Sequence, residues 1–242
     1  MRVSLLLLTT TFYLSSLGPS FAAGKSLEEC LKEFANINNA RVQRSCPILH
    51  TMPGLTRSFS EHNANCSSFI KSDGSYGTWG QGAAEYIRSK GPNSSLYSNN
   101  LAGMAGPNGI CPNWNFFDQE TKTHFWVWTL ASIAWKEATC KENARNGKAS
   151  NGVAVGLMQL DEKKSARSWR GPSCKSSSVA AADKNLRCGL DIMEDLMDGK
   201  KGIYKSNGLL YGRKNNSYWE QLRHSDGGEI GRKIRQYPLC GN

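Results

Sequence analysis

The clearest hydrophobic pattern in the chain covers residues 118–138. Asp118 is a good N-cap residue, and the residues after it are mostly apolar or aromatic. This pattern predicts a central helix. Leu130, Ile133 and Glu137 are spaced by three and four residues, so Glu137 should project from the same stripe as the apolar core residues.

Weaker patterns predict further elements. Alternation of residue types over 153–161 favours turns or short strands. Helical spacing predicts four more helices, at residues 27–44, 83–90, 179–197 and 217–223. The fold class expected from these elements is mainly α (α+β), a helical domain with a short β element.

The first 24 residues have the pattern of a secretory signal peptide. A basic start precedes an apolar stretch, and small residues allow cleavage after Ala22 or Gly24. The apolar stretch is shorter than the roughly 20 residues that a membrane span needs, and no later segment is long and apolar enough to cross a membrane. We therefore expect an exported protein, periplasmic or extracellular, without an integral membrane segment.

Cysteine usage agrees with export. The chain has 8 cysteines, all after residue 24, and in an oxidising compartment a disulfide framework is their expected use. Neither a C-x-x-C pair nor a histidine cluster suggests a metal site. The pairing stays open among the candidates Cys30, Cys46, Cys66, Cys111, Cys140, Cys174, Cys188 and Cys240.

Turn-forming residues dominate the chain between Cys46 and Cys111. Gly, Asn, Ser and Pro are frequent there, and long loops of this kind usually need covalent tethers. We expect residues 25–117 to form a loop-rich, disulfide-stapled N-terminal region packed on a catalytic domain of residues 118–242.

The chain is strongly basic, with a formal net charge of +10. The basic residues are scattered, so we expect no nucleic-acid partner, and the cluster of Arg232, Lys233 and Arg235 is typical of a solvated face. No feature indicates a cofactor, and we expect a monomer.

Glu137 is the first candidate for chemistry. A carboxylate on the apolar stripe of a core helix is costly to ionise, so its pKa should rise and it could donate a proton near neutral pH. The alternative is a salt bridge between Glu137 and a neighbour at the helix end.

The residues around Glu137 also resemble a known family. Glu137-Ala138, a turn-rich segment, the run Gly-Leu-Met-Gln-Leu-Asp at 156–161 and then Asn185 with Gly189 four residues later resemble the lysozyme-like superfamily, namely goose-type lysozymes and soluble lytic transglycosylases. The resemblance covers about residues 125–223.

The resemblance implies a glycosidase that cleaves the β-1,4 bond between N-acetylmuramic acid and glucosamine-type sugars of peptidoglycan. Glu137 would protonate the glycosidic oxygen. The residues that would line the sugar-binding cleft are Gly156, Leu157, Met158 and Gln159, with the Met158 and Gln159 side chains contacting the glycan. The alternative role of these residues is packing, which is favoured for Leu157.

The chain departs from the family pattern at several places. Ala138 replaces the usual serine, and the Tyr-Asn-Ala-Gly motif of transglycosylases is absent. Tyr218 and Tyr211 are candidates for its tyrosine, with Tyr218 preferred. Asp161 is the candidate second carboxylate, while a further family aspartate would fall near Ser150 and is missing.

The type of cleavage stays open. Hydrolysis would ordinarily use two carboxylates. If Asp161 cannot reach a water molecule, the resemblance favours lytic cleavage by the muramyl 6-hydroxyl, which forms a 1,6-anhydro end. Related folds include chitosanases, so a deacetylated glycan is a conceivable preference, against which basic side chains in the cleft would argue.

Aromatic side chains on loops could add sugar-binding surfaces, and Trp114 and Trp169 are the candidates. Two rival functions remain. One is a catalytically silent sugar-binding or inhibitory protein of the same fold, and the other is an envelope interaction module that uses residues 25–119.

Overall fold

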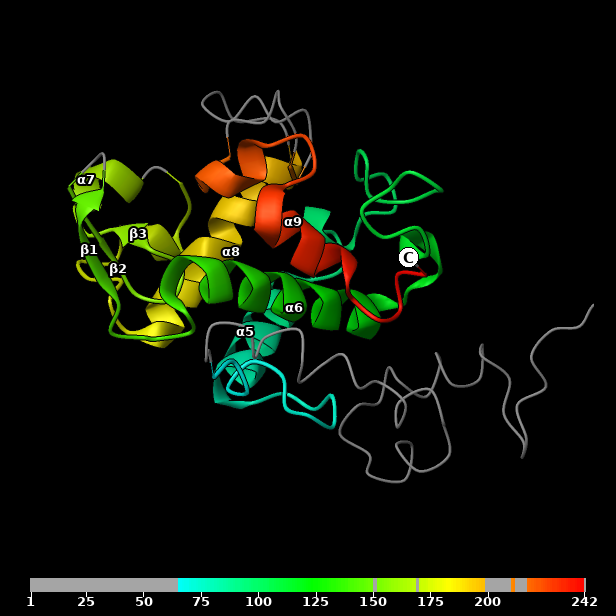
Figure 1. Ribbon diagram of the computed structural model, residues 1–242, viewed down its shortest axis with the longest axis horizontal. Helices are drawn as coiled ribbons and strands as arrows, with labels where there is room; N and C mark the ends of the chain where they lie inside the picture. Colours follow the sequence, from blue (N-terminus) through cyan, green and yellow to red (C-terminus); the bar gives the residue numbers. More distant parts are fainter. Residues whose placement is uncertain (1–64, 150–151, 169, 199–209, 212–216, 242) are drawn as a thin grey trace, which may run out of the picture.

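The computed structural model describes residues 65–149, 152–168, 170–198, 210–211 and 217–241. In this part of the chain, helices surround one central helix and a small sheet stands at one end (Figure 1). The mainly α (α+β) fold class is therefore confirmed. The predicted helix over residues 27–44 lies outside the described residues.

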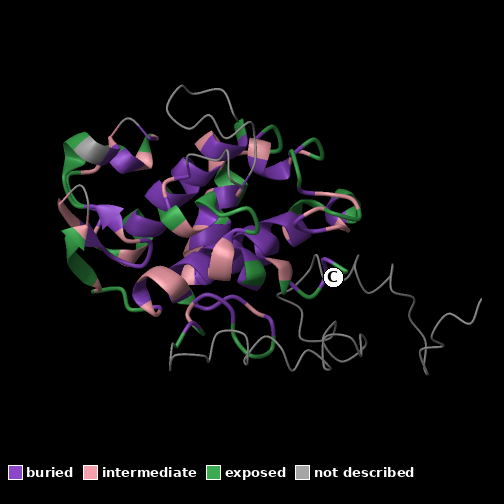
Figure 2. Ribbon diagram, turned by 45° about the horizontal axis from the view of Figure 1, so that its top comes forward, coloured by how far each residue is buried: buried purple, intermediate pink, exposed green. Residues whose placement is uncertain are grey.

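Helix α6 (Gln119–Ala138) is the predicted central helix. The Asp118 side chain caps it, accepting a hydrogen bond from the backbone N–H of Thr121 at 2.8 Å. All of residues 121–135 are buried, so the helix is enclosed on every side rather than along one stripe (Figure 2). Burial is incomplete only at the two ends of the helix, at Gln119 and Glu120 and in the last turn, which carries Glu137.

The other helices pack around α6. They are α5 (Thr78–Ser89), α8 (Ala182–Asp198) and α9 (Gly228–Arg235), and all three contact it. The indole N–H groups of α6 bind neighbouring backbone, with Trp126 donating to the Leu96 carbonyl at 2.7 Å and Trp128 to the Lys233 carbonyl at 2.8 Å. These tryptophans are core residues that fix the surrounding segments.

The sheet has three antiparallel strands in the order β1 (Arg145–Ala149), β2 (Gly152–Val155) and β3 (Leu160–Asp161). The predicted short strands over 153–161 are thus confirmed. Strand β1 was expected to be a turn-rich stretch. Its side chains are mostly exposed, and it forms a strand because its backbone pairs with β2.

Helix α5 begins earlier than predicted, at Thr78 rather than near residue 83. Gly80 and Gly82 in its first turns weaken the helical signal in the sequence. A Cβ atom at Gly80 would lie 1.9 Å from the Phe69 carbonyl oxygen. Glycine is therefore needed where the helix packs directly on the preceding loop.

The prediction of a helix over residues 217–223 is wrong. Only a short 3-10 turn, η5 (Glu220–Arg223), forms there, and the last helix is α9. Lys233 on α9 is buried, with its ammonium 4.9 Å from the ring centre of Trp135. The cluster at residues 232–235 is therefore not simply a solvated face.

The remaining short elements lie in loops. They are η2 (Ser95–Tyr97), η3 (Trp114–Phe116), α7 (Lys164–Arg167) and η4 (Ser173–Lys175).

Disulfides join distant parts of the chain, as the cysteine content predicted. Cys66 pairs with Cys140 just after α6, Cys111 pairs with Cys240 near the end of the chain, and Cys174 pairs with Cys188 on α8. Cys30 and Cys46 lie outside the described residues. Two of these bonds connect residues 65–117 to later parts of the fold.

Residues 65–117 share one hydrophobic core with the helices that follow. Phe69, Ile87, Leu96 and Trp114 are fully buried in the same cluster as the α6 side chains. This segment therefore contributes core residues as well as loops.

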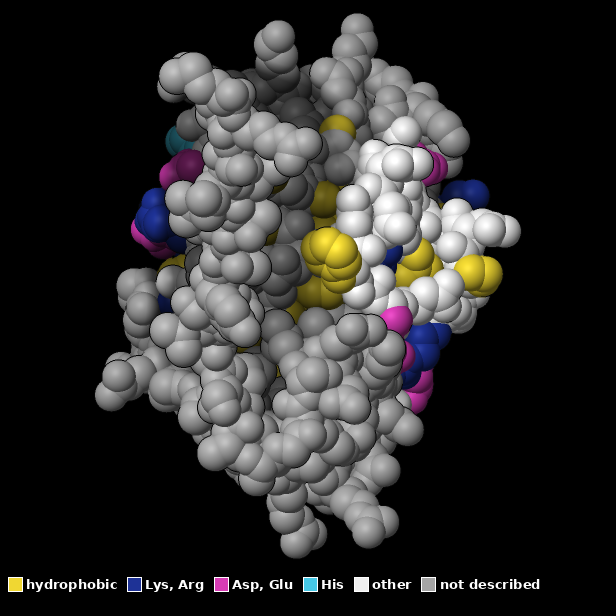
Figure 3. Space-filling model, turned by 90° about the vertical axis from the view of Figure 1, so that its right-hand side faces the viewer, with side chains coloured by type: hydrophobic (Ala, Val, Ile, Leu, Met, Phe, Trp, Pro, Cys, Tyr) yellow, Lys and Arg dark blue, Asp and Glu magenta, His cyan; other side chains and the backbone are white. Residues whose placement is uncertain are grey.

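The end of the molecule opposite the sheet shows hydrophobic side chains between polar ones, with charged groups at the margins (Figure 3). Among the described residues, Phe116 is the only large hydrophobic side chain that is exposed. In the same part of the chain, no helix combines the length and hydrophobicity needed to span a bilayer.

Candidate active site

A cleft of about 790 Å³ lies where the end of α6 meets the sheet and the segment 217–223. A second cavity of about 260 Å³ adjoins it. The two cavities share Glu137, Gln159, Tyr218 and Glu220 among their lining residues. Glu137 therefore lies at the junction of one continuous groove.

Glu137 is half-buried at the C-terminal end of α6 and makes no hydrogen bond or ion pair with the described residues. The adjacent Lys136 pairs instead with Glu229 on α9, at 2.6 Å. Burial raises the pKa of Glu137, the nearby Lys136 opposes the rise, and the negative charge of Glu220 adds to it. The Glu137 carboxyl group is thus accessible from the cleft, and its raised pKa favours the protonated form.

The turn after β2 places Gln159 in the cleft. Gly156 and Gln159 have positive φ angles of 76° and 46°, which form the tight connection to β3. The Gln159 amide donates a hydrogen bond to the Gly156 carbonyl at 2.9 Å. This turn holds the Gln159 side chain at the lining of the cleft, where the resemblance placed it.

Leu157 and Met158 do not line the cleft, so the predicted sugar contact of Met158 is wrong, while Leu157 packs in the core, the role favoured for it from the sequence. Both side chains are fully buried in the core. Gly156 is also buried and packs on Asn185, whose amide would lie 2.4 Å from a Cβ atom at this position. Gly156 allows the tight turn, and the side chains of Leu157 and Met158 anchor it in the core.

Asp161 and Tyr218 meet at the lining of the same cleft. The Tyr218 hydroxyl accepts a hydrogen bond from the backbone N–H of Asp161 at 2.7 Å, and the guanidinium of Arg170 lies 4.4 Å from the Tyr218 ring centre. Burial, followed by the Asp161 charge, raises the pKa of Tyr218, so its hydroxyl stays protonated. Asp161 and Tyr218 were both predicted from the sequence and both line the cleft.

Solvent has little access to the Asp161 carboxylate. The residue is 5% exposed, and its Oδ2 atom is buried without a hydrogen-bond partner among the described residues. Such an atom has unused capacity to accept a hydrogen bond.

Tyr211 and Trp114, two further aromatic candidates, do not reach the cleft. Tyr211 does not line it, and its hydroxyl accepts a hydrogen bond from Arg235 at 2.6 Å. Trp114 is fully buried and donates to the Ser98 carbonyl at 2.8 Å, so its prediction as a sugar subsite is wrong. Trp169 lies outside the described residues.

Sequence reasoning missed Glu220. It is exposed at the start of η5, lines both cavities and acts electrostatically on Glu137. Its position two residues after Tyr218 was the available signal. That spacing indicates a cleft residue only when the folded position of segment 217–223 near the end of α6 is known.

Basic residues dominate the cleft walls. Six of its nine charged lining residues are Lys or Arg. Arg145 on β1 pairs with Glu162 at 2.9 Å, whereas Lys141 and Lys148 are exposed beside it. Among the described residues, no group of three or more His, Cys, Asp or Glu side chains is arranged to hold a metal ion.

Comparisons with known proteins match part of this chain to a family. Residues 115–217 match the family model of the transglycosylase SLT domain. Among solved structures the chain is similar to a mutant of Bd0314 DslA, with a TM-score of 0.49, 19% identity and coverage of 68% of this chain and 91% of that chain. The wild-type form 2 of Bd0314 DslA gives a TM-score of 0.47, 20% identity and coverage of 67% and 91%. No curated protein matches the chain.

The family match begins just before α6 and ends next to Tyr218, so it includes Glu137, Gln159 and Asp161. The resemblance found in the sequence is confirmed. The match of residues 115–217 to the transglycosylase SLT domain supports a lysozyme-like fold for this part of the chain.

Proposed function

We propose that this protein is an exported lytic transglycosylase that cleaves the β-1,4 bond between N-acetylmuramic acid and the glucosamine-type sugar that follows it in peptidoglycan. The SLT domain supports the reaction class and the substrate. The leader-like residues 1–24 and the disulfides support export.

Glu137 carries the chemistry in this proposal. Its protonated carboxyl donates a proton to the glycosidic oxygen while the bond between that oxygen and C1 of the muramyl sugar breaks. The resulting carboxylate then takes the proton of the muramyl 6-hydroxyl as its oxygen bonds to C1. No water is consumed, and Glu137 returns to its protonated form.

The observation that carries the proposal is the contrast between Glu137 and Asp161. Glu137 opens on the groove with a raised pKa, whereas Asp161 is almost fully buried with its Oδ2 atom shielded from solvent. A hydrolase needs a second carboxylate to activate water or to act as nucleophile. The burial of Asp161 favours the intramolecular reaction.

The charge of the cleft bears on the state of the glycan. A deacetylated glucosamine carries an ammonium group, and walls with six basic and three acidic residues disfavour such a cation. We therefore propose acetylated strands as the better substrate, rather than the deacetylated glycan that related folds suggested.

Glu220 favours a second candidate function, hydrolysis. It is exposed and lines both cavities next to Glu137, so solvent can reach it. In this alternative Glu220 acts as the base that activates water while Glu137 acts as the acid.

Mass spectrometry of soluble products distinguishes these functions. The mature protein and its Glu220→Gln variant are incubated with purified sacculi in acetylated and chemically deacetylated form. We expect 1,6-anhydro ends from both proteins and more product from acetylated sacculi.

Other outcomes of this experiment are also informative. Reducing ends that disappear in Glu220→Gln would establish hydrolysis instead. If neither form of sacculi releases material, the protein is a catalytically silent binding protein and the proposal is wrong.

A further inference from the structure

A buried carboxylate on α8 lies next to α5, the helix that precedes the family-matched region. Asp191 on α8 has a side chain that is 2% exposed. Its Oδ1 atom accepts hydrogen bonds from the Tyr86 hydroxyl at 2.8 Å and from the Lys90 ammonium at 2.7 Å. Tyr86 lies on α5 and Lys90 caps it, so both come from outside the family-matched region.

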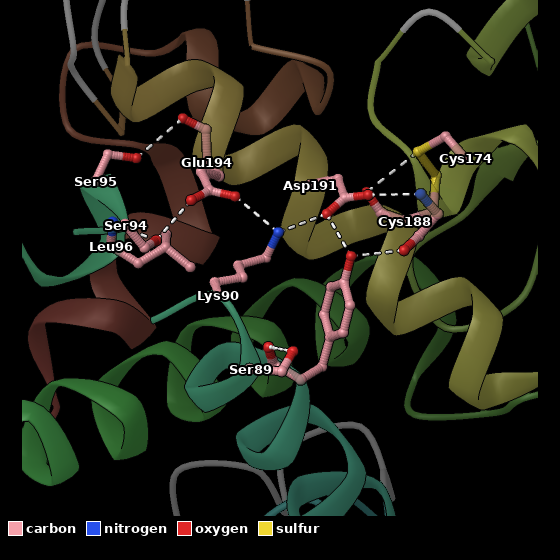
Figure 4. A network of polar contacts seen from close by, with 11 residues as sticks. Ser89, Lys90, Ser94, Ser95, Leu96, Cys174, Cys188, Asp191 and Glu194 are labelled. Atoms are coloured by element: carbon pink, nitrogen blue, oxygen red, sulfur yellow. Dashed lines mark hydrogen bonds and ion pairs between the residues drawn. A yellow bond between two sulfur atoms is a disulfide. The ribbon is translucent and has the colours of Figure 1, made fainter. Parts of the chain in front are cut away.

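Lys90 balances two acidic residues. Figure 4 shows it between Asp191 and Glu194, and it lies 2.7 Å from each carboxylate. Burial opposes the charge of Lys90, but the hydrogen bonds to both carboxylates outweigh it and raise the pKa of Lys90, so the ammonium stays charged. Removal of Lys90 would leave the buried Asp191 carboxylate without its cationic partner, which is strongly unfavourable.

The other carboxylate oxygen of Asp191 holds the loop of residues 170–175. Oδ2 accepts a hydrogen bond from the backbone N–H of Ser173 at 2.8 Å, and the hydroxyls of Ser173 and Tyr86 lie 2.6 Å apart. Gly171 packs directly on Asp191, since a Cβ atom there would lie 2.3 Å from the Asp191 Cβ. The disulfide between Cys174 and α8 closes the same loop.

This loop begins at a wall of the cleft. Arg170 is buried at its first position, and its guanidinium lies over the ring of Tyr218. Both residues line the cavity that contains Glu137. A displacement of the loop would therefore shift Arg170 and the Tyr218 ring at the lining of the cleft.

We propose that Asp191, held by Tyr86 and Lys90, is a positioning residue. Through it, the segment that contains α5 and Lys90 fixes the positions of Arg170 and Tyr218 at the cleft. The functional part of this inference rests on the proposed function, because this part of the cleft is taken to bind the glycan. Asp191 acts on substrate binding, whereas Glu137 acts on the chemical step.

Steady-state kinetics on sacculi test this role with a matched pair of variants. Asp191→Asn weakens the hold on the loop. Glu194→Gln removes the other partner of Lys90 and has no hydrogen bond to residues 170–175 in the described structure. We expect Asp191→Asn to raise KM about two- to tenfold, the range for losing one such hydrogen bond, with kcat within about twofold. Glu194→Gln should leave both constants unchanged, even if its Tm falls.

Two results would overturn the inference. One is that the two variants have the same KM although their Tm values differ. The other is that kcat of Asp191→Asn falls while its KM does not change. If Asp191→Asn does not fold, Tyr86→Phe serves the same test, because it removes the hydroxyl between Asp191 and Ser173 without changing any charge.

Hydrogen exchange gives a readout that does not depend on activity. The Ser173 N–H should exchange faster in Asp191→Asn and Tyr86→Phe than in the wild type, and unchanged exchange would contradict the positioning role. If the wild type releases nothing from sacculi, the proposed function fails while the exchange result still decides whether Asp191 holds the loop.

Discussion

His124 is a buried histidine whose environment fixes its charge. One ring nitrogen lies 3.0 Å from the Gly74 carbonyl oxygen, to which it donates, and the other lies 3.1 Å from the Tyr237 hydroxyl. Burial lowers the pKa of His124 from 6.5 to about 4, although the Gly74 carbonyl opposes this effect. The folded protein therefore keeps the ring neutral in mild acid.

A pH-dependent loss of stability follows from this residue. Between pH 6.5 and about 4 the unfolded chain binds a proton at His124 and the folded chain does not. The free energy of unfolding should fall by about 3 kcal/mol across this range from His124 alone. Urea unfolding at several pH values measures it, with His124→Gln as the variant that cannot titrate. An identical pH dependence in both proteins would contradict the assignment.

Among single residues, Glu137 lines the cleft as the sequence led us to expect. Its helical spacing from Leu130 and Ile133 does not explain this position, because α6 is buried on every side over residues 121–135 and it is the last turn of the helix that reaches the cleft. The failure at Met158 has a physical cause. Its turn contains two positive φ angles, so neither strand nor helix periodicity indicates which side chains face the core.

Asn185 joins two elements, helix α8 and the turn between β2 and β3. Its side chain is fully buried, accepts the Met158 N–H at 2.7 Å and donates to the carbonyls of Val155 and Val179 at 2.9 and 2.8 Å. A single amide thus satisfies three buried backbone groups.

Removal of this amide should be costly. We expect Asn185→Ala to lower the free energy of unfolding by about 2–5 kcal/mol, because buried backbone groups lose their partners. Chemical denaturation measures the change, and Asn93→Ala, at an exposed asparagine, is the control. A loss no larger than in the control would show that the turn does not depend on Asn185.

The elements differ in how far the sequence predicts them. Helix α6 has a capping residue and a long apolar run, so its bounds were predictable. Helix α9 was missed because it is short and contains glycine and several charged residues. Its position depends on tertiary contacts, including the ion pair between Glu229 and Lys136 and the hydrogen bond from Trp128 to its backbone.

The whole molecule is held together by contacts between distant parts of the chain. Cys66–Cys140 and Cys111–Cys240 connect positions 74 and 129 residues apart, and a disulfide that closes a long loop restricts the unfolded chain. The sequence predicted a disulfide framework but could not give its pairing, because the loops between the cysteines carry no regular pattern. The groove is likewise assembled from α6, the sheet and segment 217–223 only in the folded chain.

The raised pKa of Glu137 should also affect the thermal stability of the folded protein. Burial raises the pKa of this residue, so above that pKa the folded state bears the cost of a charged, half-buried carboxylate. Glu137→Gln removes this cost. We therefore expect its Tm at neutral pH to be at least that of the wild type, and any loss of activity cannot be attributed to unfolding.

The most direct measurement is the rate at which the mature wild-type protein and Glu137→Gln release soluble fragments from purified sacculi at neutral pH. Loss of a general acid should reduce the rate by roughly 10²–10⁴-fold while the fold is retained. A Glu137→Gln variant that is folded and releases fragments at the wild-type rate would contradict the assignment of Glu137 as the catalytic acid.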